Sequence, residues 1–509
     1  MVFTLTQTGW ADEPVDLRNA VYRKRFQLDE HGVPLVLVGM AQGLQTVEIT
    51  SSDGVDVLPH GPSGVRIQGS VSWTVRLVQG SPGRVEHYVA LESVLFTDTE
   101  TLAKTRANLS TRKPVVHEHG YVISMGTRLI DTRRTLFSLG PFDITKAQDT
   151  LKRERTLFPH AFIYAVPAAL PSGTLHISTA DGRFHIQQAN AVAFEPTKNT
   201  PLAWVHEGKT HRVPGRLIVV VGMDGQLTIV NEVSIEKYLE GILPSEMFPS
   251  APPEALKAQS VAARGQILAK MGQRHHTDPF HLCAQVHCQV YDGLEKIDTR
   301  TSATVTATAG MFLFDAAGKP IDTVYSASCG GHGEHNENVW GGKPNPHLRG
   351  RPDGPPMSRN WTRFMTQPSS SFCAKLPAGA GVFRWKIVKS PEELAKSLST
   401  YGFSGTIKEL RPLRRGVSGR ILELEVIGNK NTKITLRGEL IIRQALGGLR
   451  SSLFVHKRLP NGAFEFTGAG FGHGVGLCQW GAMGRALSGQ KFNEILEHYY
   501  QKSILVKLY

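Results

Sequence analysis

Residues 465–484 read EFTGAGFGHGVGLCQWGAMG, a stretch that leads from a β-strand end through a glycine-rich loop into a helix start. Seven glycines surround a single histidine, a single glutamine and a single tryptophan. Glycine is this dense where the backbone needs a positive φ or where a ligand must approach the main chain. The pattern predicts a loop at a strand edge that presents His473 at a binding site. A glycine-rich β-turn with a buried histidine is the alternative.

Composition sets the class of protein. The chain has 509 residues, 40% of them hydrophobic, which is enough for two or three globular domains. Its formal net charge of +13 favours polyanionic partners, but no nucleic-acid-binding motif accompanies that charge, so we expect no nucleic-acid partner. No apolar run reaches the length of a transmembrane helix, and residues 1–30 lack the features of a signal peptide. We therefore expect either a cytoplasmic protein or an export segment missing from this start.

The first third of the chain carries two patterns. Short β-type runs predict a β-rich N-terminal region over 1–69. Segments in the order β-α-β-β-α-β follow over 70–166, with helices expected at 98–113 and 143–159. This second unit resembles the SPOR-type modules that bind peptidoglycan glycan chains, most clearly at LGPFDITKAQDTL. The resemblance implies a SPOR-like glycan-binding module.

The rest of the chain, from residue 167 on, predicts two parts. A β-rich connecting segment at 167–205 leads to a domain of mixed helices and strands with a substrate cleft over 206–509. A long alanine-rich helix is expected from PEALKAQSVAARGQILAKMG, with Ser250 as a cap and prolines in its first turn. Residues 384–455 read as an inserted α/β segment. The predicted fold class is α+β.

A dense group of metal-binding residue types lies in HHTDPFHLCAQVHCQVY. Thiolate and imidazole together select zinc among the common metals, and two of each fill a structural tetrahedral site. The preferred ligands are His276, Cys283, His287 and Cys288. Two alternatives stay open: His275 instead of His276, and a disulfide between the two cysteines. A zinc with four protein ligands leaves no position for a reactive water, so the chemistry would fall to other groups.

Glu246 is the candidate acid/base, because we expect it in a proline-flanked loop beside Met247 and Phe248. A carboxyl in a partly apolar cleft would have a raised pKa and could donate a proton. A solvated surface carboxylate is the alternative. Glu236 and Glu240 in the preceding helical turn are expected on an exposed face.

Further candidates could bind a sugar chain. Ser326 and Ser328 share a strand face, and a serine–histidine nucleophile is weakly supported because no G-x-S-x-G elbow or aspartate partner is evident. Histidines could orient a substrate or be buried and hydrogen-bonded, and tryptophans could stack on sugar faces or belong to the core. The candidate substrate-binding residues are Ser326, Ser328, His332, Trp340, His473, Gln479 and Trp480.

Five blocks in a fixed order resemble the stage II sporulation protein D family, which includes wall-remodelling enzymes and amidase enhancers. They are VSIEKYLEGILPSEM, EALKAQSVAAR, CAQVHCQVYDG, IDTVYSASCGGHGEHNENVWG and GFGHGVGLCQWGAMGRALSG, within about 206–509. The resemblance implies a peptidoglycan lytic transglycosylase with Glu246 as its acid/base and a zinc bound by the His/Cys cluster.

The same resemblance implies peptidoglycan glycan strands as partner, with preference for strands without stem peptides, and an extracytoplasmic location, although no signal peptide is visible. The competing reading is a non-catalytic glycan-binding protein that enhances a cell-wall amidase. Pairing of Cys329 with Cys478 is a guess that the sequence leaves open.

Overall fold

The structure is a computed structural model that describes residues 16–509 except 60–65, 127, 159, 199, 286–287, 357, 359, 368 and 430–431. The chain forms two compact units. The first contains the described residues up to Ser245 together with Lys270–Ile297, and the second contains Glu246–Ala269 together with Asp298–Tyr509. Both units mix helices and strands, so the predicted α+β class is confirmed. The predicted 206–509 domain contributes residues to both units.

A twelve-stranded sheet dominates the first unit. Its main path is β1 (Gln27–Leu28), β2 (Pro34–Leu44), β17 (Leu227–Ser234), β16 (Arg216–Val221), β13 (Ala191–Pro196), β3 (Thr46–Leu58), β4 (Ile67–Ser81), β11 (Ser172–Thr179) and β12 (His185–Ala189). β14 (Leu202–His206) pairs with β3 and with β15 (Lys209–Val213), and β18 (Leu282–Cys283) runs parallel to β2.

Both faces of this sheet are covered at its centre. β16 reads RLIVVV, and alternate side chains of a strand point to opposite faces. Leu217 and Val219 enter one apolar cluster, whereas Ile218 and Val220 enter another that includes Leu17 of helix α1 (Leu17–Arg23). β16 is therefore buried on both faces, and this explains why its sequence is a continuous apolar run.

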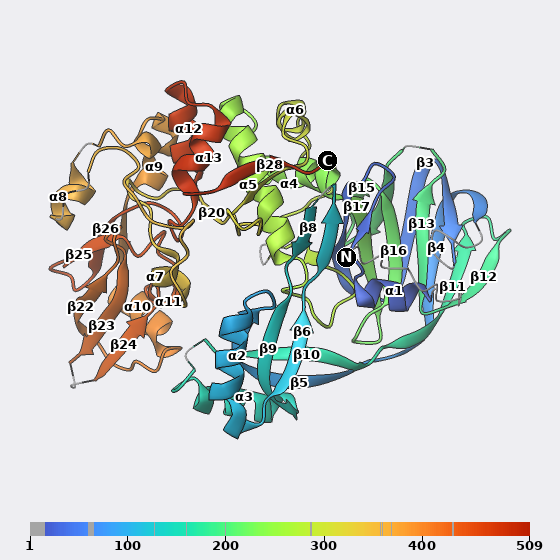
Figure 1. The fold of residues 1–509 in the computed structure, drawn as a ribbon, viewed down its shortest axis with the longest axis horizontal. Helices are drawn as coiled ribbons and strands as arrows, with labels where there is room; N and C mark the ends of the chain where they lie inside the picture. The colour runs from blue at the N-terminus through green and yellow to red at the C-terminus, as the bar shows by residue number, and fades with distance from the viewer. Residues whose placement is uncertain are drawn as a thin grey trace, which may run out of the picture. The chain divides into compact units, whose positions relative to one another are not determined.

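A separate four-stranded antiparallel sheet lies in the first unit, with the order β10 (Phe162–Ala169), β5 (Arg84–Leu95), β9 (Arg134–Phe142) and β6 (Val115–His119). Helices α2 (Thr99–Asn108) and α3 (Ile144–Glu154) lie beside it, and a short hairpin is formed by β7 (Val122–Met125) and β8 (Arg128–Asp131) (Figure 1). Asp98 caps α2 by accepting a hydrogen bond from the Thr101 amide. The predicted helices are confirmed, and the glycan-binding role of this module stays a prediction.

Helix α4 (Ile235–Glu246) corrects one sequence-based prediction. Glu246 was expected in a loop, but it is the last residue of this helix. Pro244 lies inside the final turn, where its missing N–H removes one hydrogen bond, and the helix ends two residues later. The side chain of Glu246 therefore projects from the C-terminal residue of a helix.

The core of the second unit is built around α5 (Pro253–Lys270), with α12 (Gln479–Leu487) and α13 (Phe492–Tyr499) packed against it (Figure 1). Its alanines allow close approach, so the helix is buried on most sides, as at Ala255, Ala258 and Ala262. Shorter helices are α6 (Thr299–Ala307), α7 (Asn336–Trp340), α8 (Trp361–Thr366) and α9 (Ala380–Phe383).

Small sheets complete the second unit. β19 (Met311–Phe314) pairs with the C-terminal strand β28 (Ile504–Lys507), and a single β-bridge joins Phe314 to Pro320 just after β19. The segment predicted as α/β, 384–455, contains β21 (Arg384–Lys389), α10 (Pro391–Ser399), β22 (Ile407–Arg415), β23 (Ile421–Gly428), β24 (Lys433–Arg437) and α11 (Glu439–Ala445). Two strands that extend beyond it, β25 (Phe454–Arg458) and β26 (Phe464–Ala469), share its small core. Among the residues described, no helix has both the length and the apolarity to cross a membrane.

Candidate functional site

Two of the sequence blocks that were singled out lie side by side in the second unit. β20 (Tyr325–Ser326) runs parallel to β27 (Leu477–Cys478). Just beyond them, the main chains of Ser328 and Phe471 exchange two hydrogen bonds of 3.0 and 2.9 Å. The glycine-rich loop is therefore attached along its length to the serine-containing segment, although about 150 residues separate them in sequence.

Glu246 is connected to this pair of segments. Nε2 of Gln479 donates a hydrogen bond to the main-chain oxygen of Glu246 at 2.9 Å. The ring of Trp480 lies 5.6 Å from the ring of Phe248, two residues after Glu246. Glu246 itself is half-buried. The structure thus brings the candidate acid/base, Gln479 and Trp480 together.

The remaining predicted sugar contacts differ in exposure. Trp340 is 50% exposed, and its ring lies 4.9 Å from that of the half-buried His473. His473 accepts a hydrogen bond at Nδ1 from the Val475 amide at 3.0 Å, which fixes the imidazole on the loop. These two rings form a surface on which a sugar face could stack.

Three other candidates are buried. The Oγ of Ser326 accepts a hydrogen bond from the Gly474 amide, and the fully buried Ser328 accepts one from the Gly330 amide. Nδ1 of His332 donates to the Gly333 carbonyl at 2.7 Å, and burial lowers the pKa of this imidazole. These hydrogen bonds hold the two loops in shape, and the role of the three side chains in substrate binding stays a prediction.

Two positioning residues were missed by the sequence reasoning. Glu334 is fully buried and accepts hydrogen bonds from the Ser418 amide and hydroxyl. The buried Arg420 donates from its guanidinium to the carbonyls of Cys329 and Gly472 at 3.3 and 3.2 Å. Glu334 was inside a quoted block, but nothing local marked Arg420, since its partners are distant in sequence.

Glycine is required at position 474 of the loop. Gly474 has φ +75°, and a Cβ there would lie 2.5 Å from the Arg420 guanidinium carbon. Both the backbone and the neighbouring cation therefore exclude a larger residue. The glycine lets the loop lie directly on Arg420.

The first unit holds the expected His/Cys cluster. One ligand atom each of His275, Cys283 and Cys288 lies within 4.8 Å of the others. Nε2 of His275 lies 3.4 Å from Sγ of Cys288, and Nδ1 lies 2.9 Å from the Asp278 carboxylate. A carboxylate behind an imidazole is the usual way to orient a histidine ligand. These residues fit a zinc ion by their donor chemistry and by the direction of Nε2.

The pKa values of this cluster reflect the contacts among its own side chains. Burial lowers the pKa of His275, but hydrogen bonds to Asp278 and Cys288 outweigh it and raise the pKa to about 9. For Cys288, burial raises the pKa, and the opposing bond from His275 brings it down to about 7. Cys283 is held in place because β18 pairs it with Gly39 of β2.

The other histidines of this segment are placed differently. His276, preferred from the sequence, contacts the rings of His119 and Tyr164 at 5.1 and 4.7 Å, and the structure puts its neighbour His275 beside the cysteines instead. The reason is the left-handed backbone at His275, φ 54°, which turns the two side chains apart. His287 lies outside the described residues. No disulfide joins the two cysteines.

Comparisons with known proteins agree with this arrangement of blocks. Residues 223–314 match the family model described as Stage II sporulation protein, and 334–476 match a domain of unknown function. An uncharacterized protein of Brachyspira hyodysenteriae is 32% identical over 287 residues, which is 56% of this chain and 69% of that protein.

Two named relatives are also similar. The amidase enhancer of Bacillus subtilis is 31% identical over 295 residues, 52% of this chain and 40% of the enhancer. The stage II sporulation protein D of Bacillus amyloliquefaciens is 28% identical over 287 residues, 53% of this chain and 74% of that protein.

Proposed function

Because the chain belongs to the stage II sporulation protein family, we propose that it is a peptidoglycan lytic transglycosylase that cleaves glycan strands, preferentially those without stem peptides. The observation that carries the proposal is the hydrogen bond from Gln479 to the main chain of Glu246. It links the main chain at Glu246, the carboxylate of the SEM block, to the segment that carries His473 and Trp480.

Glu246 acts first as an acid and then as a base. Its protonated carboxyl gives a proton to the glycosidic oxygen as the bond from that oxygen to the anomeric carbon of muramic acid breaks. The resulting carboxylate takes the proton of the 6-hydroxyl of the same sugar while that oxygen bonds to the anomeric carbon. The product is a 1,6-anhydro ring, the carboxyl is protonated again, and no water is consumed. A hydrolase would need a second carboxylate for its water.

Substrate binding is assigned to the exposed groups. The rings of Trp340 and His473 offer a stacking surface, and Trp480 beside Phe248 offers another close to Glu246. Ser326, Ser328 and His332 serve the same site by holding its loops. The four-stranded module of the first unit would add glycan affinity, as would the net charge of +13 against an acidic polymer.

A zinc ion held by His275, Cys283, Cys288 and His287 would supply structural cross-linking and leave the acid/base chemistry to Glu246. An extracytoplasmic site of action, in the periplasm, cell wall or intermembrane space, follows from the proposed substrate. The 31% identity to an amidase enhancer supports a second candidate function, in which the protein holds glycan strands while a cell-wall amidase cuts.

A pair of matched variants separates the two candidates. Glu246→Gln keeps the shape of the side chain but removes its titration, and Glu240→Gln makes the same change earlier in α4, where Glu240 pairs with Lys237. The transglycosylase proposal expects release of soluble fragments from stem-peptide-free strands by wild type and Glu240→Gln, and none by Glu246→Gln. Enhancement of an added amidase by all three proteins, without fragment release by any alone, would favour the enhancer.

A further inference from the structure

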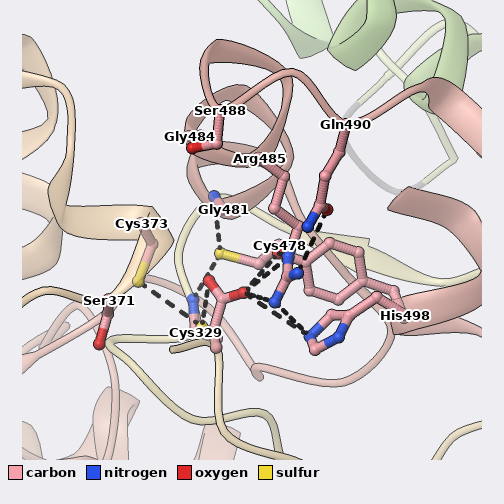
Figure 2. A network of polar contacts seen from close by, with 12 residues as sticks. Cys329, Ser371, Cys373, Cys478, Gly481, Gly484, Arg485, Ser488, Gln490 and His498 are labelled. Carbon is pink, nitrogen blue, oxygen red and sulfur yellow. Dashed lines mark hydrogen bonds and ion pairs between the residues drawn. The ribbon is translucent and has the colours of Figure 1, made fainter. Parts of the chain in front are cut away.

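The second unit contains a cluster that the proposed function does not use. The side chains of Cys329, Cys373, Cys478 and Asp353 converge in the interior, and one ligand atom of each lies within 4.8 Å of all the others. All four residues are buried, and Figure 2 shows Cys329, Cys373 and Cys478 close to one another. They come from separate parts of the chain. Cys329 lies after β20, Asp353 lies after α7, Cys373 lies in a 3-10 turn at Phe372–Ala374, and Cys478 directly precedes α12.

We propose that Cys329, Cys373, Cys478 and Asp353 form a second structural metal site, for zinc or a similar thiophilic divalent cation. The inference is independent of the glycan-cleaving function, and it concerns a different unit from the His275 cluster.

The distances suit a tetrahedral ion. Zinc bonds of about 2.3 Å to sulfur and about 2.0 Å to oxygen place two sulfurs about 3.8 Å apart and a sulfur and an oxygen about 3.5 Å apart. Sγ of Cys329 lies 3.7 Å from Sγ of Cys373 and 3.6 Å from Oδ2 of Asp353. A disulfide would require about 2.05 Å between the sulfurs, so none joins Cys329 to Cys373.

The surroundings hold the ligands ready. Sγ of Cys478 accepts hydrogen bonds from the Cys329 and Gly481 amides at 3.1 and 3.2 Å, which favours a thiolate at the N-terminal end of α12. Oδ1 of Asp353 accepts bonds from Arg485 at 2.8 Å and from Tyr499 at 2.9 Å. Oδ1 is therefore occupied by Arg485 and Tyr499, and Oδ2 faces the sulfurs. Hydrogen bonds of this kind orient carboxylate ligands at metal sites.

The cluster contains enough ionisable groups to compensate a bound cation. Asp353 is paired with Arg485, and both side chains are almost completely buried. The charge of a divalent ion would be compensated by the ionised forms of the three thiols and by the carboxylate. A small pocket next to the cluster is lined by Cys329, Asp353 and His498.

Such an ion would tie together the loops of the candidate glycan site from beneath. Cys329 directly follows Ser328, and Cys478 directly precedes Gln479 and Trp480. With four protein ligands the shell is closed, so the ion would be structural.

Metal content of the full chain tests the proposal. Wild-type protein, purified anaerobically with zinc and dialysed against a weak chelator, should carry two equivalents by elemental mass spectrometry. Cys373→Ser should carry about one equivalent, bound at the His275 cluster. Cys288→Ser should also carry about one, bound at the Cys329 cluster. Ser371→Ala, a matched change of a buried residue in the same turn, should keep two. X-ray absorption of wild type should show more than two sulfurs per zinc on average, a readout that does not depend on a variant folding.

One equivalent in wild type that survives Cys373→Ser and disappears in Cys288→Ser would overturn the proposal and leave the His275 cluster intact. A Cys329–Cys373 disulfide found in the anaerobically purified protein would also overturn it, because the sulfurs of a disulfide are not thiolate ligands.

Discussion

The side-chain amide of Gln479 donates a hydrogen bond to the main-chain oxygen of Glu246 at 2.9 Å, and this single bond joins the start of α12 to the end of α4. Gln479 is the first residue of its helix, and Glu246 is the last residue of the other. The carboxyl proposed to carry the chemistry is thus positioned by the block that carries the proposed sugar contacts.

Removing that bond should lower activity more than stability. Gln479→Leu releases the Glu246 carbonyl, and a displacement of about 1 Å in a reacting group costs on the order of 100-fold in rate. Gln501→Leu is the matched control, since Nε2 of Gln501 donates a similar bond to the Arg349 carbonyl at 2.7 Å. We expect the two variants to have comparable melting temperatures and only Gln479→Leu to lose cleavage rate. Equal rates in both variants would contradict the positioning role.

Truncating the exposed ring should weaken glycan binding. Trp340→Ala removes half of the Trp340–His473 surface, and loss of an aromatic stack of about 1 kcal/mol corresponds to a several-fold weaker affinity. Phe184→Ala removes an exposed ring of the first unit and serves as the control. Co-sedimentation with glycan strands measures both. Unchanged binding by Trp340→Ala would remove that surface from the site.

The choice between adjacent histidines can be read from metal content. His275→Ala should lose the metal of the first unit, because Nε2 of His275 lies beside Cys288, whereas His276→Ala should retain it. Elemental mass spectrometry of the two variants decides this. Loss only in His276→Ala would show that the ring turned toward Tyr164 in this structure moves to the metal when it binds.

The loop glycine at 474 should be intolerant of a methyl group. Gly474→Ala places a Cβ 2.5 Å from the Arg420 guanidinium and also strains φ, so we expect about 2–4 kcal/mol of lost stability. Gly448→Ala has a similar φ of +78° but nothing within 4 Å, so only the backbone strain of about 1–2 kcal/mol should appear. Denaturant unfolding compares them. Equal losses would mean that Arg420 moves aside freely.

Acid should destabilise the first unit through His281. This side chain is buried between the Leu37 amide and the Lys24 carbonyl, and burial lowers its pKa to about 3. Its unfolded pKa is near 6.5, so the stability it contributes is present above that value and is lost as pH falls from about 6.5 toward 3, by about 1.4 kcal/mol per pH unit at most. His281→Asn should be less stable at pH 7 but should show a shallower decline on acidification. Parallel curves for both proteins would contradict this origin.

Local patterns in the sequence predicted much of the fold. The helix capped by Asp98, the alanine-rich α5 and the small α/β core around β23 form where the sequence patterns predicted them, although α5 begins at Pro253 and is not capped by Ser250 as expected. The helical end of α4 was missed because Pro244 favours a loop on local grounds, and a proline in the last helical turn gives the same sequence.

The candidate site was harder to predict, because its geometry depends on contacts between distant segments. The glycine-rich block indicated a loop, but its support by Arg420 and by Glu334 depends on tertiary packing that no local pattern carries. The same holds for the thiol cluster, where Cys373 and Asp353 join Cys329 and Cys478 only in three dimensions. The shift from His276 to His275 depends on one residue with positive φ.

The most direct test of the central claim is mass spectrometry of the ends of stem-peptide-free glycan strands after incubation with wild-type protein or with Glu246→Gln. The account predicts fragments that end in 1,6-anhydromuramic acid for wild type and intact strands for the variant. Fragments with reducing ends, or equal cleavage by both proteins, would contradict the assignment of Glu246 as the single acid and base.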